Sequence, residues 1–436
     1  MKHTDTAQPV RDLAVDFYRV SGVVLIVLGH WLAGSVTYHN GQFGRENPLV
    51  DQPWTQWLTW PFQAVPVFFL VAGYAGAVSW ARHCGNGAGS RRAWLQRRLA
   101  RVLGPTAAYV GLISAIVVAL LAYGVPGSLL EYAGWAVAMH LWFLAIYLLV
   151  VSLPPLAVAA HRRWGLRAPT VLALAVVAVD IASIGADIPH LGWLNYLFCW
   201  GGLYQLGIAW HGGLLTGYRP MVLAAGSGLA LMLLIWIGPY PVSMIEVPGQ
   251  PIQNTTPPSA AMLAFAGAQA AVAVTMAPTL HRMLRSRLTQ WLLSVANNNV
   301  MALYLWHMVP VVIVAIVAYP IGLLPQPEQG TAAWWLARLQ WALILSLVTA
   351  VELTMLLWLR RFFAAPLPMM RVPLTNRWGE PLMLVGAAMA AGFLWFIATA
   401  GFAPSGKFPW LAVAVFAVGL VLVACQPQQD QSAVGE

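Results

Sequence analysis

The chain has 436 residues, of which 60% are hydrophobic and 8% are charged, and its mean hydropathy is +0.70. A soluble domain carries about 25% charged residues, so this composition excludes a soluble fold and indicates a polytopic membrane protein. The net charge of +9 does not indicate a nucleic-acid partner, because the basic residues lie in short clusters between apolar stretches.

The apolar stretches have the length of helices that cross a bilayer. They predict an all-α, polytopic membrane helix bundle with about 12 transmembrane helices. The predicted spans are residues 15–37, 57–80, 103–123, 136–159, 169–186, 193–214, 220–238, 259–281, 298–319, 334–359, 381–400 and 408–425. Three cysteines, Cys84, Cys199 and Cys425, are widely spaced and are expected to be free thiols.

The distribution of basic residues predicts the orientation of these spans. With the N-terminus inside, 20 of the 23 Lys and Arg residues fall on one side, and only Arg45, Arg338 and Lys407 fall outside it. Cytoplasmic loops carry the excess of Lys and Arg. We therefore expect both termini in the cytoplasm and a location in the inner or plasma membrane.

The first span carries three polar residues, Asp16, Arg19 and His30. Eleven helical positions bring Arg19 and His30 back to nearly one face, about 16 Å apart along the axis. Asp16 and Arg19 are three apart and can pair. Arg19 is either an interfacial anchor that reaches the headgroups or a functional cation. His30 is either a packing histidine or a general base.

A basic cluster, RRAWLQRRLAR at residues 91–101, precedes the third span and contains Arg98 and Arg101 one turn apart. It predicts an amphipathic entry helix at the membrane surface. Its arginines either set the topology and contact lipid phosphates, or bind an anionic cytosolic ligand such as the phosphates of a nucleotide-bearing cofactor.

Later spans contain further polar groups. His140 and Trp142 lie in span four, and residues 240–259 form the longest outer loop, which either lines an outward-facing site or simply connects two spans. Span nine contains Tyr304, Trp306 and His307. Since spans one and nine run in the same direction, His30 and His307 are expected at similar depth.

Five motifs resemble those of the membrane acyltransferase 3 family, in the order and on the spans expected. The first is Asp16, Arg19 and His30, and the second is Phe68–Phe69 followed by Ala72, Gly73 and Tyr74. The others are Arg98 and Arg101 before Pro105, then His140 with Trp142, Phe143 and Leu144, and finally Tyr304, Leu305, Trp306 and His307. Together they cover roughly residues 12–365.

The resemblance implies transfer of an acyl group, usually acetyl, from cytosolic acyl-CoA to a carbohydrate hydroxyl. It implies catalytic roles for His30, Arg19 and Asp16, and donor binding by Arg98 and Arg101. His307, Trp306, Tyr304, His140 and Trp142 would line the acceptor side. No metal is expected, and the partners are the lipid bilayer, acyl-CoA and a carbohydrate acceptor.

The chain also departs from the family pattern. A soluble hydrolase-like domain is expected to be absent, and the sequence LRRFFAAPLP at residues 359–368 lacks the acidic residue that often ends the last core helix. We expect an acyltransferase-like domain at residues 1–365, two additional helices at 366–425 and a polar cytoplasmic tail at 426–436.

A second function from a different class fits the same residues. A proton-coupled carrier of a small or lipid-linked solute would use Arg19, His30 and the intramembrane carboxyls Asp180 and Glu352 as a relay. Many carriers contain two-fold internal repeats, and the sequence shows none. This difference favours the acyltransferase.

Overall fold

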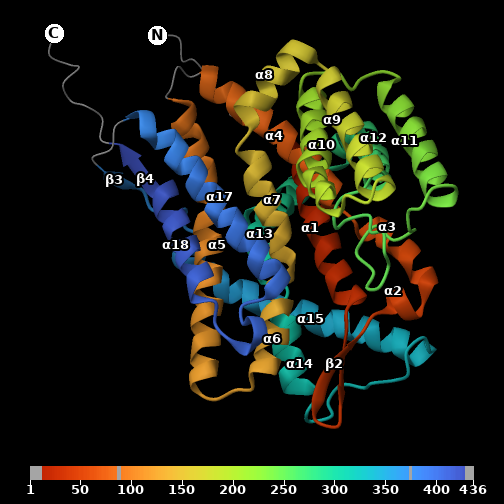
Figure 1. Cartoon of the computed structure of the whole chain (residues 1–436), viewed down its shortest axis with the longest axis vertical. Coiled ribbons are helices and arrows are strands. Elements are labelled where there is room, and N and C mark those ends of the chain that lie inside the picture. The colour runs from red at the N-terminus through yellow and green to blue at the C-terminus, as the bar shows by residue number, and fades with distance from the viewer. Residues whose placement is uncertain (1–11, 86–89, 373–375, 428–436) are drawn as a thin grey trace.

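The structure, a computed structural model, describes residues 12–85, 90–372 and 376–427 (Figure 1). Helices dominate the described residues, and the four strands form two small sheets. β1 (Ser35–His39) pairs antiparallel with β2 (Gln42–Glu46), and β3 (Met370–Val372) pairs parallel with β4 (Cys425–Pro427). The prediction of an all-α polytopic membrane bundle is confirmed. The expected cytoplasmic tail lies almost entirely outside the described residues.

Each of the twelve predicted spans contains a helix. Eight helical segments in the described chain are long and apolar enough to cross a membrane, and ten if two bent pairs each count as one span. The helices are α1 (Leu13–Ala33), α2 (Pro48–Asp51), α3 (Thr59–Phe62), α4 (Val65–Gly85), α5 (Arg91–Ala122), α6 (Gly127–Ala136), α7 (Trp142–Val151), α8 (Pro154–Trp164), α9 (Arg167–Asp180), α10 (Asn195–His211), α11 (Arg219–Trp236), α12 (Ala260–Met283), α13 (Arg287–Trp306), α14 (Val309–Ala318), α15 (Ala332–Trp358), α16 (Arg360–Phe363), α17 (Asn376–Ala400) and α18 (Trp410–Ala424).

Two boundaries differ from the sequence prediction. α1 ends at Ala33, and the chain continues into the β1–β2 hairpin. The turn between the two strands is formed by Asn40 and Gly41, which both have positive φ. An Asn-Gly pair between β-branched and aromatic residues favours this tight turn over a longer helix. The basic cluster at 91–101 is not a separate surface helix. It forms the first three turns of the continuous 32-residue helix α5.

Two spans are broken near their middle. α6 and α7 are bent by 40° around the short 3-10 helix η2 (Met139–Leu141), and α13 and α14 are bent by 54°. Pro310 contributes to the second bend because it has no N–H to donate to the carbonyl of Trp306. A broken helix exposes backbone groups inside the bundle, which is tolerated only where protein or a polar cavity satisfies them.

The helices pack around two hydrophobic cores. One core is built mainly from α1, α5, α7, α13, α15, α17 and α18, and the other from α4, α9, α10 and α12. In Figure 1 the β3–β4 pair lies in the upper part of the molecule and the β1–β2 hairpin at the bottom. We call the end where α5 begins, with Arg91–Arg101, the arginine-rich end, and the opposite end the hairpin end.

The long segment between α11 and α12 is closely packed against the bundle. The indole of Trp60 donates to the carbonyl of Val242 (2.9 Å), and the amide of Gln63 donates to that of Met244 (2.6 Å). Met244 is fully buried. These contacts fix the segment over α3 and the start of α4, so it is an ordered cover of the second core.

Candidate active site

Three histidines from distant parts of the chain meet inside the bundle. His30 lies on α1, His140 on η2, and His307 at the bend between α13 and α14. The rings of His30 and His307 stack with centroids 5.2 Å apart, and the rings of His140 and His307 meet edge to face at 4.8 Å. His140 and His307 are buried, whereas His30 keeps part of its surface accessible. The prediction of similar depth for His30 and His307 is confirmed by this contact.

The hydrogen bonds between these groups fix the tautomers of two imidazoles. His307 Nδ1 lies 2.8 Å from the carbonyl oxygen of Tyr304, which can only accept, so Nδ1 carries the proton. In neutral His307 the Nε2 atom is then an acceptor, and it lies 2.9 Å from Nδ1 of His30. His30 therefore donates from Nδ1 and carries its lone pair on Nε2. Within the described chain, no hydrogen bond engages that Nε2 atom.

Backbone groups released by the two helix breaks hold the histidines in place. The indole of Trp31 donates to the carbonyl of His307 (2.9 Å), and the hydroxyl of Tyr304 donates to the carbonyl of His140 (2.6 Å). Tyr109 on α5 donates to the carbonyl of Val137 (2.6 Å), just before η2. Three separate helices thus tie down the backbone at the two breaks that carry His140 and His307.

Two of the predicted substrate-binding residues lie away from the histidines. Trp306 is buried edge-on against Tyr109 and Phe363, and Trp142 contacts Phe143 and Tyr196. Both rings pack between helices. Of the five residues proposed for the acceptor side, His307 contacts His30, and His140 and Tyr304 contact His307.

At the other end of α1, Arg19 is held by its neighbours. Its guanidinium lies 3.7 Å from the carboxylate of Asp16 and donates to Oδ1 of Asn297 on α13 (3.2 Å). About a third of the Arg19 side chain remains exposed (32%). The pairing of Asp16 with Arg19 is confirmed, and Arg19 retains an accessible surface for an anion.

The two arginines proposed for donor binding differ in exposure. Arg98 is half-buried and lies over the ring of Trp94, 5.4 Å from its centroid, whereas Arg101 is exposed. Gly76 on α4 leaves room for the buried hydroxyl of Tyr204, and a Cβ atom added there would lie 3.8 Å from Nη1 of Arg98. Both arginines lie at the arginine-rich end. The described residues show no contact between either of them and Arg19.

Sequence reasoning missed some residues that shape the site. Tyr109, Trp31 and Arg338 carry no motif of their own, although an arginine inside an apolar span, as at Arg338, is a recognisable signal. The intramembrane carboxyl Asp180 belongs elsewhere. It accepts hydrogen bonds from Asn195 (2.7 Å), the Tyr240 hydroxyl (2.8 Å) and the Ala260 N–H (2.6 Å), and so has a structural role in the second core.

The arrangement has the parts of a general-base site. Among the described residues, no group of three or more His, Cys, Asp or Glu side chains is placed to hold a metal ion. The three described cysteines are free thiols, as expected. The open Nε2 of His30 instead offers a base deep within a bundle whose one end is strongly basic.

The chain matches the model of a known protein family. The family model of the acyltransferase domain, acyltransferase 3, matches residues 12–357 and thus covers all three histidines and the arginines discussed above. No curated protein and no solved structure matches the chain. Since the family model covers 346 of the 436 residues, the chain belongs to the acyltransferase 3 family and is a multi-pass membrane acyltransferase.

Proposed function

We propose that this protein is an integral-membrane O-acyltransferase that moves an acyl group, in the simplest case acetyl, from cytosolic acyl-CoA to a hydroxyl of a carbohydrate. The observation that carries the proposal is the hydrogen-bond chain from the Tyr304 carbonyl through His307 to His30. This chain leaves Nε2 of His30 as a fixed proton acceptor.

The chemical step follows from that lone pair. His30 Nε2 removes the proton from the acceptor hydroxyl while the hydroxyl oxygen attacks the thioester carbonyl carbon. The new C–O bond forms, the C–S bond breaks, and the proton held by His30 passes to the departing thiolate. His307 stabilises the transient imidazolium, because its Nε2 accepts the hydrogen bond from His30 Nδ1 throughout.

The arginine-rich end supports the donor assignment. Arg101 is exposed, Arg98 is half-buried and Arg19 is partly exposed, so each has donors available for phosphate oxygens. A nucleotide-bearing thioester would be anionic at one end and would extend toward His30 at the other. On this proposal the arginine-rich end faces the cytosol, and the acceptor approaches from the opposite membrane surface.

The test uses purified full-length protein in liposomes with radiolabelled acetyl-CoA. We expect thioester consumption that is lost in His30→Ala by about 10²–10⁴-fold and kept in His190→Ala, which changes an exposed histidine of η4 (Pro189–Leu194). Solute uptake without consumption of acetyl-CoA would instead establish the carrier. Equal rates for His30→Ala and the wild type would rule out His30 as the base.

A further inference from the structure

The route from the arginine-rich end to His30 runs between α1 and α13, and two contacts mark its ends. Arg19 on α1 donates to Asn297 on α13, and His30 on α1 meets His307, the residue that follows α13. The two contacts are eleven residues apart on α1 and ten residues apart on α13, which is about 15–16 Å along each helix axis. A thioester whose phosphates are held by the arginines has to cross this distance inside the bundle to reach His30.

The ring of Phe68 on α4 lies across the inner part of this route. A Cβ atom on Gly22 of α1 would lie only 2.9 Å from Cε2 of Phe68, so the ring rests directly on the α1 backbone. Gly22 is three residues after Arg19 and eight residues before His30. The Phe68 ring is therefore seated on α1 between the level of Arg19 and the level of His30.

Two more rings continue from Phe68 to the histidines. Phe143 on α7 meets Phe68 edge to face, with ring centroids 5.6 Å apart, and meets Tyr304 on α13 in the same way at 5.6 Å. Tyr304 is three residues before His307, and helical side chains tilt toward the N-terminus of their helix, which in α13 is the arginine-rich end. Phe68, Phe143 and Tyr304, which we call the aromatic row, thus lie on the arginine-rich side of the histidine cluster.

Two members of the aromatic row are incompletely packed. Phe143 lies where the two hydrophobic cores meet and packs against both. Phe68 and Phe143 keep part of their surface accessible, whereas Tyr304 is buried and its hydroxyl is bonded to the carbonyl of His140. Groups with fewer buried contacts are displaced at a lower free-energy cost than fully packed ones. Phe68 and Phe143 are therefore the members of the row that can move, and Tyr304 is fixed.

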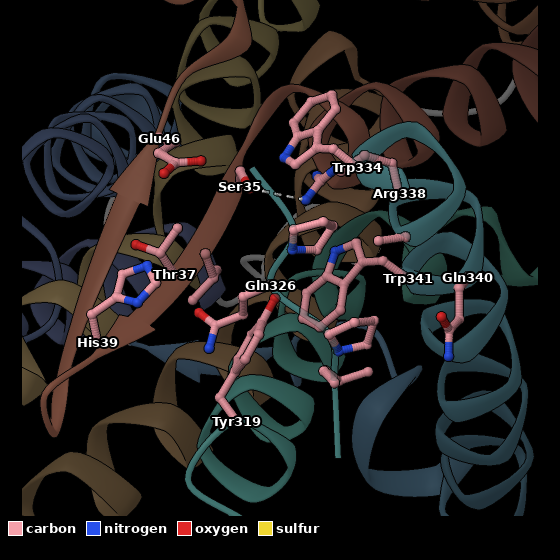
Figure 2. A pocket seen from close by; sticks show the side chains of 15 residues that line it. Ser35, Thr37, His39, Glu46, Tyr319, Gln326, Trp334, Arg338, Gln340 and Trp341 are labelled. Atoms are coloured by element: carbon pink, nitrogen blue, oxygen red, sulfur yellow. Dashed lines mark hydrogen bonds between the residues drawn. The ribbon is translucent and has the colours of Figure 1, made fainter. Parts of the chain in front are cut away.

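The helix that carries Arg19 and His30 is anchored on both sides of the row. Near its start, Arg19 is bonded to α13. At its other end, Arg338 on α15 donates to the carbonyl of Trp31 (2.6 Å) and to the hydroxyl of Ser35 (3.3 Å). Figure 2 shows the bond to Ser35 at the pocket between the β1–β2 hairpin and α15. Since α1 is held at both ends, rotation of a ring opens the route with less disruption than movement of the helix.

We propose that the aromatic row is a gate on the donor side of the active site and that Phe68 is its moving part. With no donor bound, the ring rests on Gly22 and separates His30 from the water of the arginine-rich end. When the ring leaves Gly22, the thioester arm of the donor takes its place and reaches His30. Exclusion of water favours attack by the acceptor hydroxyl over hydrolysis of the thioester. The identity of the donor rests on the proposed acyl transfer, whereas the barrier itself can be tested without that chemistry.

The first experiment measures passage through the row with a thiol reagent. Cys84 and Cys425, which have accessible surface, are changed to Ser, buried Cys199 is kept, and His30→Cys places a thiol beyond the row. A membrane-impermeant, negatively charged methanethiosulfonate is added to vesicles whose outer surface is the arginine-rich face. A protein that retains Cys84, at the end of α4, verifies this orientation by its rapid reaction. We expect the thiol introduced by His30→Cys to react about tenfold faster when Phe68→Ala is added, because the ring no longer blocks the route.

Phe62→Ala is the matched control for this measurement. A Cβ atom on Gly29 would lie 3.0 Å from Cβ of Phe62, so this residue also packs on a glycine of α1, but at the level of His30 and beyond the row. Its loss should leave the reaction rate unchanged. Phe68→Leu keeps apolar volume without a ring, should give an intermediate rate, and decides the question if Phe68→Ala does not fold. Equal rates with and without the Phe68 substitutions, or an equal increase in Phe62→Ala, would overturn the gate.

The second experiment measures hydrolysis of radiolabelled acetyl-CoA in the absence of an acceptor, with His30 intact. We expect Phe68→Ala to hydrolyse the thioester about tenfold faster than the wild type, with little change in the KM for acetyl-CoA, because the ring excludes water and does not bind the phosphates. Hydrolysis no faster than in the wild type would overturn the role of Phe68 in excluding water. Faster thiol labelling in Phe68→Ala, together with no consumption of acetyl-CoA by the wild type or the variant, would keep the barrier and reject the proposed acyl transfer.

Discussion

A carbonyl oxygen determines which ring nitrogen of each histidine carries the proton, because a carbonyl can only accept a hydrogen bond. The Tyr304 carbonyl sets the proton on His307 Nδ1, and His307 Nε2 in turn sets the proton on His30 Nδ1. A single helix bend therefore orients two rings. Removing the second ring would leave His30 able to adopt either tautomer and to rotate.

This argument predicts the behaviour of His307→Ala. We expect kcat for acetyl transfer to fall about tenfold, the equivalent of one lost hydrogen bond of about 1.4 kcal/mol, with little change in the KM for acetyl-CoA. Steady-state kinetics in liposomes would measure both values. His190→Ala, which changes an exposed histidine of η4 outside the cluster, tests whether any histidine loss has this effect. An unchanged kcat in His307→Ala would show that His30 needs no partner.

At the residue level, the sequence predicts that His30 and His307 lie at similar depth, because their spans run in the same direction; their contact is seen only in the structure. It does not predict that Trp306 turns away toward Tyr109. Neighbouring residues on a helix face different directions, so Trp306 and His307 could not both point to His30. Which one does so depends on the bend after His307, and bend geometry is a tertiary property.

At the scale of elements, α4 and α10 approach unusually closely. A Cβ atom on Gly207 would overlap the carbonyl oxygen of Leu70, and one on Gly73 would overlap that of Tyr204. Small residues allow such close helix contact in membranes, where packing replaces the hydrophobic driving force. A Cβ atom on the nearby Gly76 would overlap the hydroxyl of Tyr204, so this glycine also permits the close crossing.

Gly207→Ala should therefore destabilise the bundle by about 1–3 kcal/mol through overpacking. The matched control is Gly226→Ala on α11, where an added Cβ meets no atom within 4 Å. That variant should be as stable as the wild type or slightly more stable, because alanine favours helix. Thermal unfolding in detergent would compare them. Equal midpoints for the two variants would contradict the close contact.

Asp180 connects elements rather than moving protons. Its two carboxylate oxygens accept from α10, from the segment before α12 and from the first N–H of α12. In Asp180→Asn, one oxygen becomes an amide that cannot accept, so at least one buried donor loses its partner at a cost of about 1–3 kcal/mol. The thermal midpoint should fall, while exposed Asp187→Asn should not change it. Loss of acyl transfer in an Asp180→Asn protein of wild-type stability would contradict this structural role.

The elements that the sequence predicts best are the long apolar helices, because span length follows directly from bilayer thickness. The predicted first span ends at residue 37 and so includes the first three residues of β1, because they continue the apolar run of α1. Only the Asn-Gly turn signals the hairpin, and the pocket beside it depends on α15 residues some 300 positions away. Such long-range pairing cannot be inferred from a local pattern.

For the molecule as a whole, α17 and α18 belong to the same hydrophobic core as the histidine-bearing helices. The family model ends at residue 357, yet the buried residues Leu394, Ile397 and Phe402 lie in that core. α17 contacts α7 and η2, the segment that carries His140. Phe402, which follows α17, packs toward Tyr109, and its N–H reaches the carbonyl of Gly134.

These contacts predict that the last two helices support catalysis without contributing a reacting group. A chain ending at residue 365 should unfold at a lower temperature and lose acetyl transfer, because η2 would lose its packing. Phe402→Ala tests the same contact in the full-length chain. This substitution removes a fully buried aromatic ring, so it should lower the free energy of unfolding by about 3–5 kcal/mol and should also lower kcat. Phe396→Ala, at a position of α17 that is 37% exposed, should change both quantities much less. If the shortened chain keeps the wild-type midpoint and rate, α17 and α18 do not support the site, and their packing on η2 has no catalytic consequence.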